Sequence, residues 1–368
     1  MIYLDYQATT ALAPEAEAAM TAAMAHYGNP NSAHRLGRIA AADVELARDR
    51  VRAALGKTDG TLVFTSGATE ALNIAIVGAA RASSPERRRV VTIATEHAAV
   101  LETVRSLRHE GFEPVILPVG PDGLVDLDIA EAAIDERAAL LAVMQVNNEI
   151  GVIQPVDALI AIARASGVPV LCDAVQGFGK LLTPDSDMIA ITAHKMHGPK
   201  GIGALWLREG LDIQPLLHGS GQEYGLRPGT SSPMLCAGFG VAAELAMTRR
   251  EAGMAHVERL WQAARRAFEG WTINGSTEAR YRGNLNIRKE GVDAARLVSS
   301  LRNVCVSLGS ACASGTGKPS HVLRAIGLSD AEARSSLRIG FGRYTQIEEI
   351  EQAAGAINEA AESQKVAA

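Results

Sequence analysis

The chain has 368 residues, of which 47% are hydrophobic and 21% charged, and its formal net charge is -5. This composition is typical of a soluble protein with a large core and two domains. The negative charge and the aromatic content of 4% argue against nucleic-acid binding. No uncharged segment is long and apolar enough to cross a bilayer, and the first basic residue, Arg35, lies too late for a secretory signal or transit peptide.

Apolar runs typical of strands alternate with helical patterns through the first two thirds of the chain. The expected strands are 62–64, 90–94, 115–117, 140–146, 168–172, 188–192 and 202–207, and the helices between them include 70–80, 98–109 and 157–165. This alternation predicts an α/β fold with a mostly parallel central sheet and helices on both faces. The loop between the last two strands is too short for a helical crossover, so we expect that pair to be antiparallel.

The pattern changes after about residue 248. Expected helices over 249–269 and 293–301 accompany strand-like segments at 284–288 and 304–308, which indicates a smaller α+β domain. We therefore predict a large domain over residues 15–248 and a small domain made of residues 1–14 and 249–368.

The four cysteines, Cys172, Cys236, Cys305 and Cys312, lack the spacing of metal ligands, so we expect no metal site. Three of them lie in apolar segments and are expected to pack as small buried hydrophobic residues. Thiols that stay reduced favour a cytoplasmic protein.

Lys195 follows an expected strand and precedes a Gly-Pro-Lys-Gly turn, and Asp173 ends the preceding apolar strand. Alone, Lys195 would be read as an exposed loop residue and Asp173 as a helix cap. Together they favour pyridoxal phosphate, because a lysine amine can form an imine with its aldehyde and a carboxylate can keep its ring nitrogen protonated. The bound ring would then accept electrons.

Other polar residues follow expected strands. Residues 65–70, Thr-Ser-Gly-Ala-Thr-Glu, open a helix whose backbone N–H groups could bind a phosphate, or Thr65 or Ser66 could simply cap that helix. His97 could stack on a flat ring or move a proton, or be structural. The amide of Asn148 could bind a carboxylate or form a turn, and Gln176 could donate to a ring oxygen or begin a helix.

The second half of the chain adds three candidates. Cys312 is the only cysteine among small polar residues, as an accessible thiolate nucleophile requires, although a free surface thiol is the alternative. Arg338 could clamp a carboxylate with two hydrogen bonds or form a surface ion pair. The glycine-rich run 218–230 could approach a ligand or a neighbouring subunit, or be an ordinary surface loop.

With these motifs in one order along residues 3–343, the chain resembles the cysteine desulfurases, which are class-V, fold-type I pyridoxal phosphate enzymes. The shared motifs stand at 3–10, 28–34, 65–70, 96–97, 147–151, 173–176, 194–195 and 310–312, and the longer cysteine loop is similar to group I. Ala11, Ser220 and Tyr224 depart from the family pattern, and the last two affect the loop expected to cross between subunits.

The resemblance implies that the protein converts L-cysteine to L-alanine and leaves the sulfur as a persulfide on Cys312. An acceptor protein in iron–sulfur cluster assembly or tRNA thiolation would then take the sulfur. Lys195 would hold the cofactor and move protons, with His97 stacked on the ring as the third catalytic residue. Arg338 and Asn148 would bind the substrate carboxylate.

The resemblance also implies a set of residues that bind the cofactor. Asp173 would pair with the ring nitrogen and Gln176 with the ring hydroxyl. The phosphate would be held by residues near three chain turns, Ala68, Thr69, Thr192 and His194, and by Thr230 from the partner subunit of a homodimer.

Three alternatives share parts of this pattern. A selenocysteine lyase and a class-V transaminase would both use Lys195 and Asp173, and the transaminase would not need Cys312. A non-enzymatic scaffold or sulfur-relay protein would be expected to have lost the lysine or the nucleophile, and the sequence keeps both.

Overall fold

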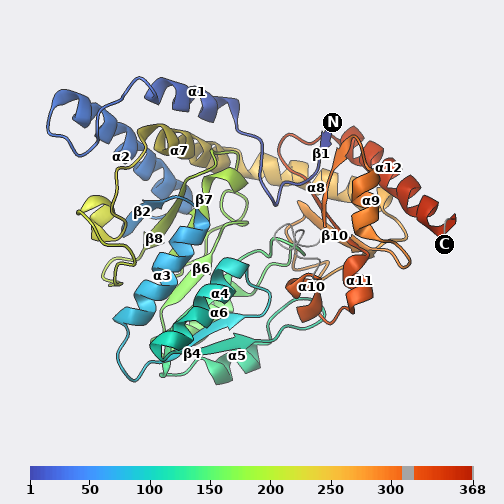
Figure 1. The fold of residues 1–368 in the computed structure, drawn as a ribbon, viewed down its shortest axis with the longest axis horizontal. Helices are drawn as coiled ribbons and strands as arrows, with labels where there is room; N and C mark the ends of the chain where they lie inside the picture. The colour runs from blue at the N-terminus through green and yellow to red at the C-terminus, as the bar shows by residue number, and fades with distance from the viewer. Residues whose placement is uncertain (309–318, 367–368) are drawn as a thin grey trace.

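A seven-stranded sheet forms the centre of the larger lobe in the computed structural model, which describes residues 1–308 and 319–366 (Figure 1). Its strand order is β2-β8-β7-β6-β5-β3-β4. The strands are β2 (Thr61–Thr65), β3 (Arg89–Ile93), β4 (Glu113–Leu117), β5 (Ala138–Met144), β6 (Val170–Asp173), β7 (Met188–Thr192) and β8 (Gly203–Leu207).

Pairing in this sheet is parallel from β7 through β4, and β8 runs antiparallel to both β7 and β2. The expected α/β class and the antiparallel pair are thus confirmed. Most strand residues are buried on both faces of the sheet, which explains their continuous hydrophobic runs. Strand β5 ends at Met144, so the last two residues of the expected strand 140–146 lie in the loop that follows it.

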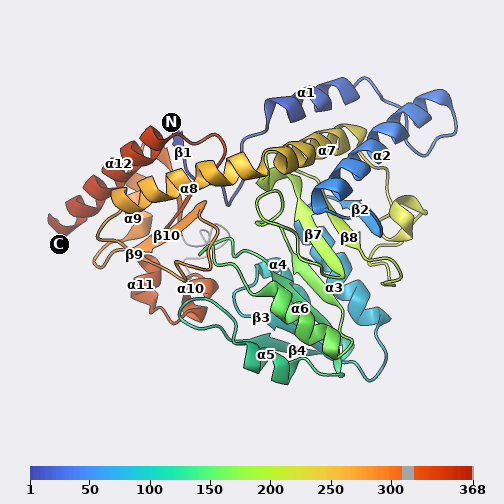
Figure 2. The same cartoon turned by 180° about the vertical axis from the view of Figure 1, so that it is seen from behind.

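Helices cover both faces of the sheet (Figures 1 and 2). Helices α3 (Ala68–Ala82) and α4 (Ala98–Ser106) pack on one face, and α2 (Arg35–Leu55), α6 (Val156–Ala165) and α7 (Pro233–Thr248) on the other. Helix α1 (Pro14–Ala23) packs on α7, and α5 (Leu127–Ala133) packs beside α6 and against β4. The sequence patterns did not single out α2 or α7, which pack closely against each other.

The smaller lobe is built on a four-stranded antiparallel sheet in the order β12-β13-β10-β9. Its strands are β9 (Thr272–Ile273), β10 (Asn284–Arg288), β12 (Ser307–Leu308) and β13 (Ser336–Gly340), and its core contains residues of α8 (Arg250–Ala267), α9 (Ala294–Ser300) and α12 (Ile347–Val366). The expected strand 304–308 is divided, because β11 (Val304–Cys305) pairs instead with the N-terminal strand β1 (Ile2–Tyr3).

The two lobes meet along one side of the large sheet. Helix α8 leads from α7 into the smaller lobe, where both ends of the chain lie (Figure 1). Short helices α10 (His321–Ala325) and α11 (Asp330–Arg334) pack against the loop after β5, with Ile150 and Val152 in their shared core. In the described part of the chain, no helix has the length and apolar character needed to cross a membrane.

Candidate active site

Most of the candidate residues gather at one edge of the large sheet. Asp173 ends β6 and Thr192 ends β7, while His97 and Asn148 each stand four residues after the end of β3 and β5. The carboxyl ends of parallel strands meet at one edge, which is where open α/β sheets bind ligands. The fold therefore brings together residues that are far apart in the sequence.

Lys195 ends a single 3-10 turn, Ala193–Lys195, that follows β7. Its ammonium is partly buried and donates hydrogen bonds to the carbonyl oxygens of Gln7 and Ala8, at 2.5 and 2.7 Å. The side chain therefore points inward, toward the N-terminal segment, rather than into solvent. This placement agrees with the sequence-based argument that Lys195 is not a solvated loop residue.

Asp173 is a buried carboxyl at the same edge, with 5% of the residue exposed. Its Oδ1 accepts a 3.0 Å hydrogen bond from the Val175 amide. Burial raises its pKa to about 6, and the Val175 bond and the positive charge of Lys195 partly oppose that shift. A buried carboxyl of this kind gains stability from a cationic partner, so the site fits the protonated ring nitrogen of pyridoxal phosphate.

Gln176 is held beside Asp173 by the N-terminal segment. Its Nε2 donates to the Gln7 carbonyl oxygen at 3.0 Å, and its Oε1 accepts a long 3.5 Å contact from Lys180. The Gln7 carbonyl therefore receives bonds from both Lys195 and Gln176. Sequence patterns missed this role of Gln7, because a main-chain oxygen has no residue signature.

His97 caps α4, and its Nδ1 accepts a 3.1 Å bond from the Ala99 amide. Burial, followed by the positive charge of Lys195, lowers the pKa of His97. The imidazole is thus neutral near pH 7, and because its Nδ1 accepts a hydrogen bond it carries its proton on Nε2. The structural and the catalytic interpretations of His97 are compatible, since each uses a different ring nitrogen.

The start of α3 is placed to receive a phosphate. A β-carbon at Gly203 would lie 2.7 Å from the carbonyl carbon of Gly67, so only glycine lets β8 approach this turn. Ala68 and Thr69 form the first turn of α3, and no side chain caps that helix. The alternative in which the side chain of Thr65 or Ser66 caps this helix is therefore wrong: Thr65 donates to the Gly67 carbonyl, and the Ser66 amide donates to Glu70.

The two other phosphate candidates lie close to this turn in the fold. The Thr192 hydroxyl donates to the Ile202 carbonyl at 3.1 Å, and His194 Nδ1 lies 3.2 Å from the Thr9 hydroxyl. Burial and the nearby Lys195 lower the pKa of His194 to about 4, so this imidazole is also neutral. It would act as a hydrogen-bond donor rather than as a cation.

Arg338 and Asn148 meet at the boundary between the lobes. Arg338 lies on β13 with only 1% of the residue exposed, so its interpretation as a surface ion pair is wrong. Its Nη1 donates to the Asn148 carbonyl at 3.2 Å, and its Nη2 pairs with Asp5 at 2.9 Å. Its buried Nε has no partner in the described part of the chain. The sequence analysis gave Asp5 no role.

Thr230 is exposed in the loop after β8. Arg227 of this loop pairs with Glu70 of α3 at 3.1 Å. Closer to the core, the buried Glu223 carboxylate accepts hydrogen bonds from the Arg48 guanidinium at 2.9 and 3.0 Å. The loop is thus tied firmly to the large lobe while Thr230 remains open to solvent.

Cys312 lies outside the described residues, but the chain that follows it is anchored at this site. The Ser320 hydroxyl donates to the buried Glu149 carboxylate. His321 Nε2 donates to the Glu96 carbonyl at 2.9 Å. Glu96 and Glu149, which follow β3 and β5 at the sheet edge, therefore hold the chain just after residue 318.

Two buried carboxyls of this site have no role in the sequence analysis. Glu96 accepts a 2.8 Å bond from the Met144 amide, and burial raises its pKa well above the usual value, with Asp173 adding to the shift. Burial likewise raises the pKa of Glu149 to about 7. Both stand inside motifs that the sequence marked, next to His97 and Asn148, but burial could not be read from the sequence.

Comparisons with known proteins agree with this geometry. The model of the class-V aminotransferase family matches residues 2–353. A mitochondrial cysteine desulfurase of Arabidopsis thaliana is 42% identical over 364 residues, covering 96% of this chain and 80% of the relative. The cysteine desulfurase IscS of Rickettsia akari is 40% identical over 368 residues, covering 97% and 90%.

A solved structure of a NifS-like protein superposes with a TM-score of 0.91 at 32% identity, and 99% of each chain is covered. The similarity thus includes both lobes and the site between them. The expected resemblance is confirmed: this chain belongs to the class-V aminotransferase family and, within it, to the cysteine desulfurases.

Proposed function

We propose that this protein removes sulfur from L-cysteine with the help of pyridoxal phosphate. The thiol of Cys312 would take the sulfur, so that L-cysteine and the enzyme thiol give L-alanine and an enzyme persulfide. The observation that carries the proposal is that Lys195 and Asp173 lie at one edge of the large sheet, where the buried Arg338 contacts the loop after β5. Because the chain belongs to the class-V aminotransferase family, we interpret this geometry as a pyridoxal phosphate site.

The donor set fits the cofactor residue by residue. Lys195 would hold it, Asp173 would keep its ring nitrogen protonated, and Gln176 would face its ring hydroxyl. Its phosphate would lie at four positions near the start of α3, namely Ala68, Thr69, Thr192 and His194. When bound, pyridoxal phosphate supplies an electron sink that weakens the carbon–sulfur bond of the substrate.

The chain's own side chains would orient the substrate and move its protons. Arg338 would clamp the α-carboxylate with the amide of Asn148, since a guanidinium offers paired donors to a carboxylate. The neutral His97 would stack on the ring and exchange a proton through Nε2. Lys195 would move a second proton, and Cys312 would attack the substrate sulfur.

One experiment tests the function and the nucleophile together. The purified protein is incubated with L-cysteine and a reductant, and alanine and sulfide are measured. Equal amounts of both are expected from the native protein, and no sulfide from Cys312→Ala, which should still bind the cofactor. Full sulfide release by Cys312→Ala would overturn the nucleophile, while transfer of the amine to a keto acid would indicate a transaminase.

Selenocysteine is the discriminating second substrate. A desulfurase turns over L-cysteine readily, whereas a lyase selects selenocysteine strongly. Parallel assays with both amino acids at equal concentration therefore decide between them, with rapid alanine formation from L-cysteine expected here.

The assembly and location remain proposals as well. We infer a homodimer in which the exposed Thr230 reaches the partner's cofactor phosphate, and an acceptor protein of iron–sulfur assembly or tRNA thiolation. The two sheets with separate cores support a large domain over 15–248 and a small one from 1–14 and 249–368. The unpaired, buried thiols of Cys172 and Cys236 support a cytoplasmic location.

A further inference from the structure

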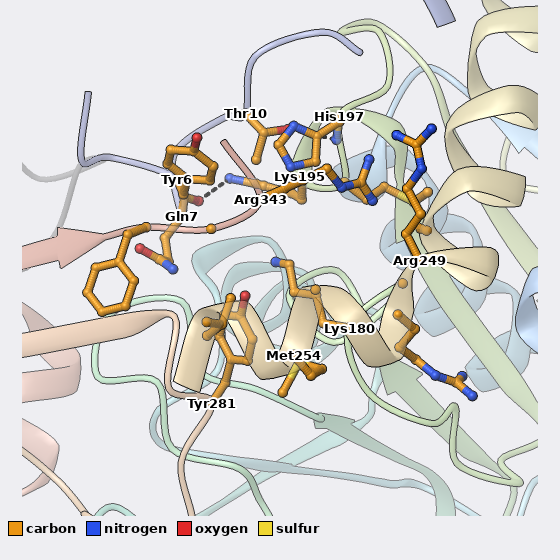
Figure 3. A pocket seen from close by; sticks show the side chains of 18 residues that line it. Tyr6, Gln7, Thr10, Lys180, Lys195, His197, Arg249, Met254, Tyr281 and Arg343 are labelled. Carbon is orange, nitrogen blue, oxygen red and sulfur yellow. Dashed lines mark hydrogen bonds between the residues drawn. The ribbon is translucent and has the colours of Figure 1, made fainter. Parts of the chain in front are cut away.

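A cleft between the two lobes is lined in part by Lys195 (Figure 3). Its walls come from the N-terminal segment, the loops after β6 and β7, the junction of α7 and α8, and the chain after β13. Lys180 and Tyr281 lie on one side of the cleft, and His197 and Arg343 on the opposite side. Both lobes therefore contribute polar groups to one narrow space.

The lining of this cleft is strongly basic. Its basic side chains are Lys180, Lys195, Arg249, Arg250 and Arg343, while burial lowers the pKa of His197 to about 4, so this imidazole is neutral near pH 7. Among the described residues that line it, none is an aspartate or a glutamate. The charge of Arg249 is partly neutralised by a residue outside the lining, because Arg249 pairs with Glu15 at 2.8 Å. The remaining positive charge has no acidic counterpart in the lining.

Two basic side chains that line the cleft, Lys180 and Arg343, are poorly compensated. The Nη1 of Arg343 is buried and has no hydrogen-bond partner in the described part of the chain. Lys180 contacts Gln176 only at 3.5 Å and lies 5.1 Å above the ring of Tyr281. Burial and the charge of Lys195 lower the pKa of Lys180 to about 7. Buried cations without a counterion are costly, so a bound anion would stabilise this arrangement.

The cleft is separate from the cofactor and substrate site. Of the residues proposed for that site only Lys195 lines it, and its ammonium is turned toward the carbonyls of Gln7 and Ala8. The enclosed space is about 50 Å³. One water needs roughly 10–15 Å³ by the same measure, so the cleft has room for an occupant of a few non-hydrogen atoms.

We propose that this cleft is a second anion site, which binds a small tetrahedral oxyanion of the phosphate or sulfate class between Lys180 and Arg343. The paired donors of a guanidinium suit two oxygens of such an ion, and the lysine ammonium supplies a point charge for a third. Because Lys180 belongs to the larger lobe and Arg343 to the smaller one, the bound ion would bridge the two.

The test uses the cofactor-loaded protein, so that the cofactor's own phosphate already fills its site. Sodium phosphate and sodium sulfate are titrated calorimetrically in a phosphate-free buffer, with sodium chloride at equal ionic strength as the reference. We expect saturable binding of one oxyanion per chain in the millimolar range or tighter. Absence of saturable binding, or equal binding of chloride, would overturn the proposal.

Variants locate the binding in the cleft. Arg343→Met and Lys180→Met should each weaken oxyanion binding at least tenfold, whereas Arg265→Met, an exposed arginine on α8, should not change it. Circular dichroism and cofactor absorbance verify that each variant is folded and loaded. If a variant fails that check, crystals of the native protein soaked in tungstate give the answer, with anomalous density expected in the cleft. Equal binding by all variants, or tungstate only elsewhere, refutes the assignment.

Discussion

Replacing Arg338 with glutamine tests the substrate-binding part of the site most directly. The guanidinium is buried, so little water competes for its hydrogen bonds with a bound carboxylate. Two charge-assisted hydrogen bonds of about 1.5–3 kcal/mol each amount to roughly 3–6 kcal/mol of lost binding. At about 1.4 kcal/mol per decade, kcat/KM for L-cysteine should fall by a factor of roughly 10²–10⁴.

Arg338 also pairs with Asp5 at 2.9 Å, so its loss could instead reduce activity by disturbing the fold. A control variant separates these two effects. Asp5→Asn removes that ion pair and keeps the guanidinium, so it is the matched control, and kcat/KM should fall less than in Arg338→Gln because the donors to the substrate carboxylate remain. Alanine and sulfide are measured over a range of L-cysteine concentrations, with cofactor occupancy determined by absorbance. Equal losses in the two variants would mean that Arg338 acts only as a tether.

Three further outcomes follow from the buried groups. Cys312→Ala should retain the bound-cofactor absorbance and form no persulfide, as read by mass spectrometry. Because Asp173 has a pKa of about 6 without the cofactor, cofactor affinity of the empty protein should rise as pH rises through 6; Asp173→Asn should remove that dependence in a fluorescence titration. The pKa of Glu149 is raised from its usual 4.5 to about 7, so its protonated form contributes stability that is fully present below pH 4.5 and lost as pH rises through 7. The thermal midpoint of Glu149→Gln should therefore fall less between pH 5 and pH 8 than that of the native protein. An identical pH dependence of the midpoint in the two proteins would contradict this assignment.

The sheet and its site edge were largely predictable from the sequence. Buried parallel strands are continuous apolar runs, and the polar residue that follows each run marks the edge where ligands bind. This rule found Asp173, Lys195 and His97 from local context alone. Assigning these residues to one site still required recognition of the family. The local pattern around each residue was equally compatible with an ordinary structural role.

Contacts between distant segments were not predictable. Gln7 acts through its main-chain oxygen, which carries no side-chain signature, and Asp5 meets Arg338 only when the N-terminal segment packs beside β13. The Glu149 carboxylate accepts a hydrogen bond from the Ser320 hydroxyl, which lies 171 residues away in the sequence. Burial decides each of these interactions, and burial of a polar residue follows from the tertiary structure rather than from hydrophobic periodicity.

The N-terminal segment links the part of the site proposed to bind the substrate carboxylate to the part proposed to bind the cofactor. Asp5 bonds to the arginine proposed for the substrate carboxylate, and two residues later the Gln7 carbonyl bonds to the lysine proposed for the cofactor. Three consecutive residues, Asp5 to Gln7, therefore span from Arg338 in the smaller lobe to Lys195 in the larger one. Because the Arg338 guanidinium is buried and the Lys195 ammonium is partly buried, breaking either bond would leave a poorly solvated charge. A short strap of this kind holds the carboxylate clamp at a set distance from the reacting amine, which is what orientation of a small amino acid requires.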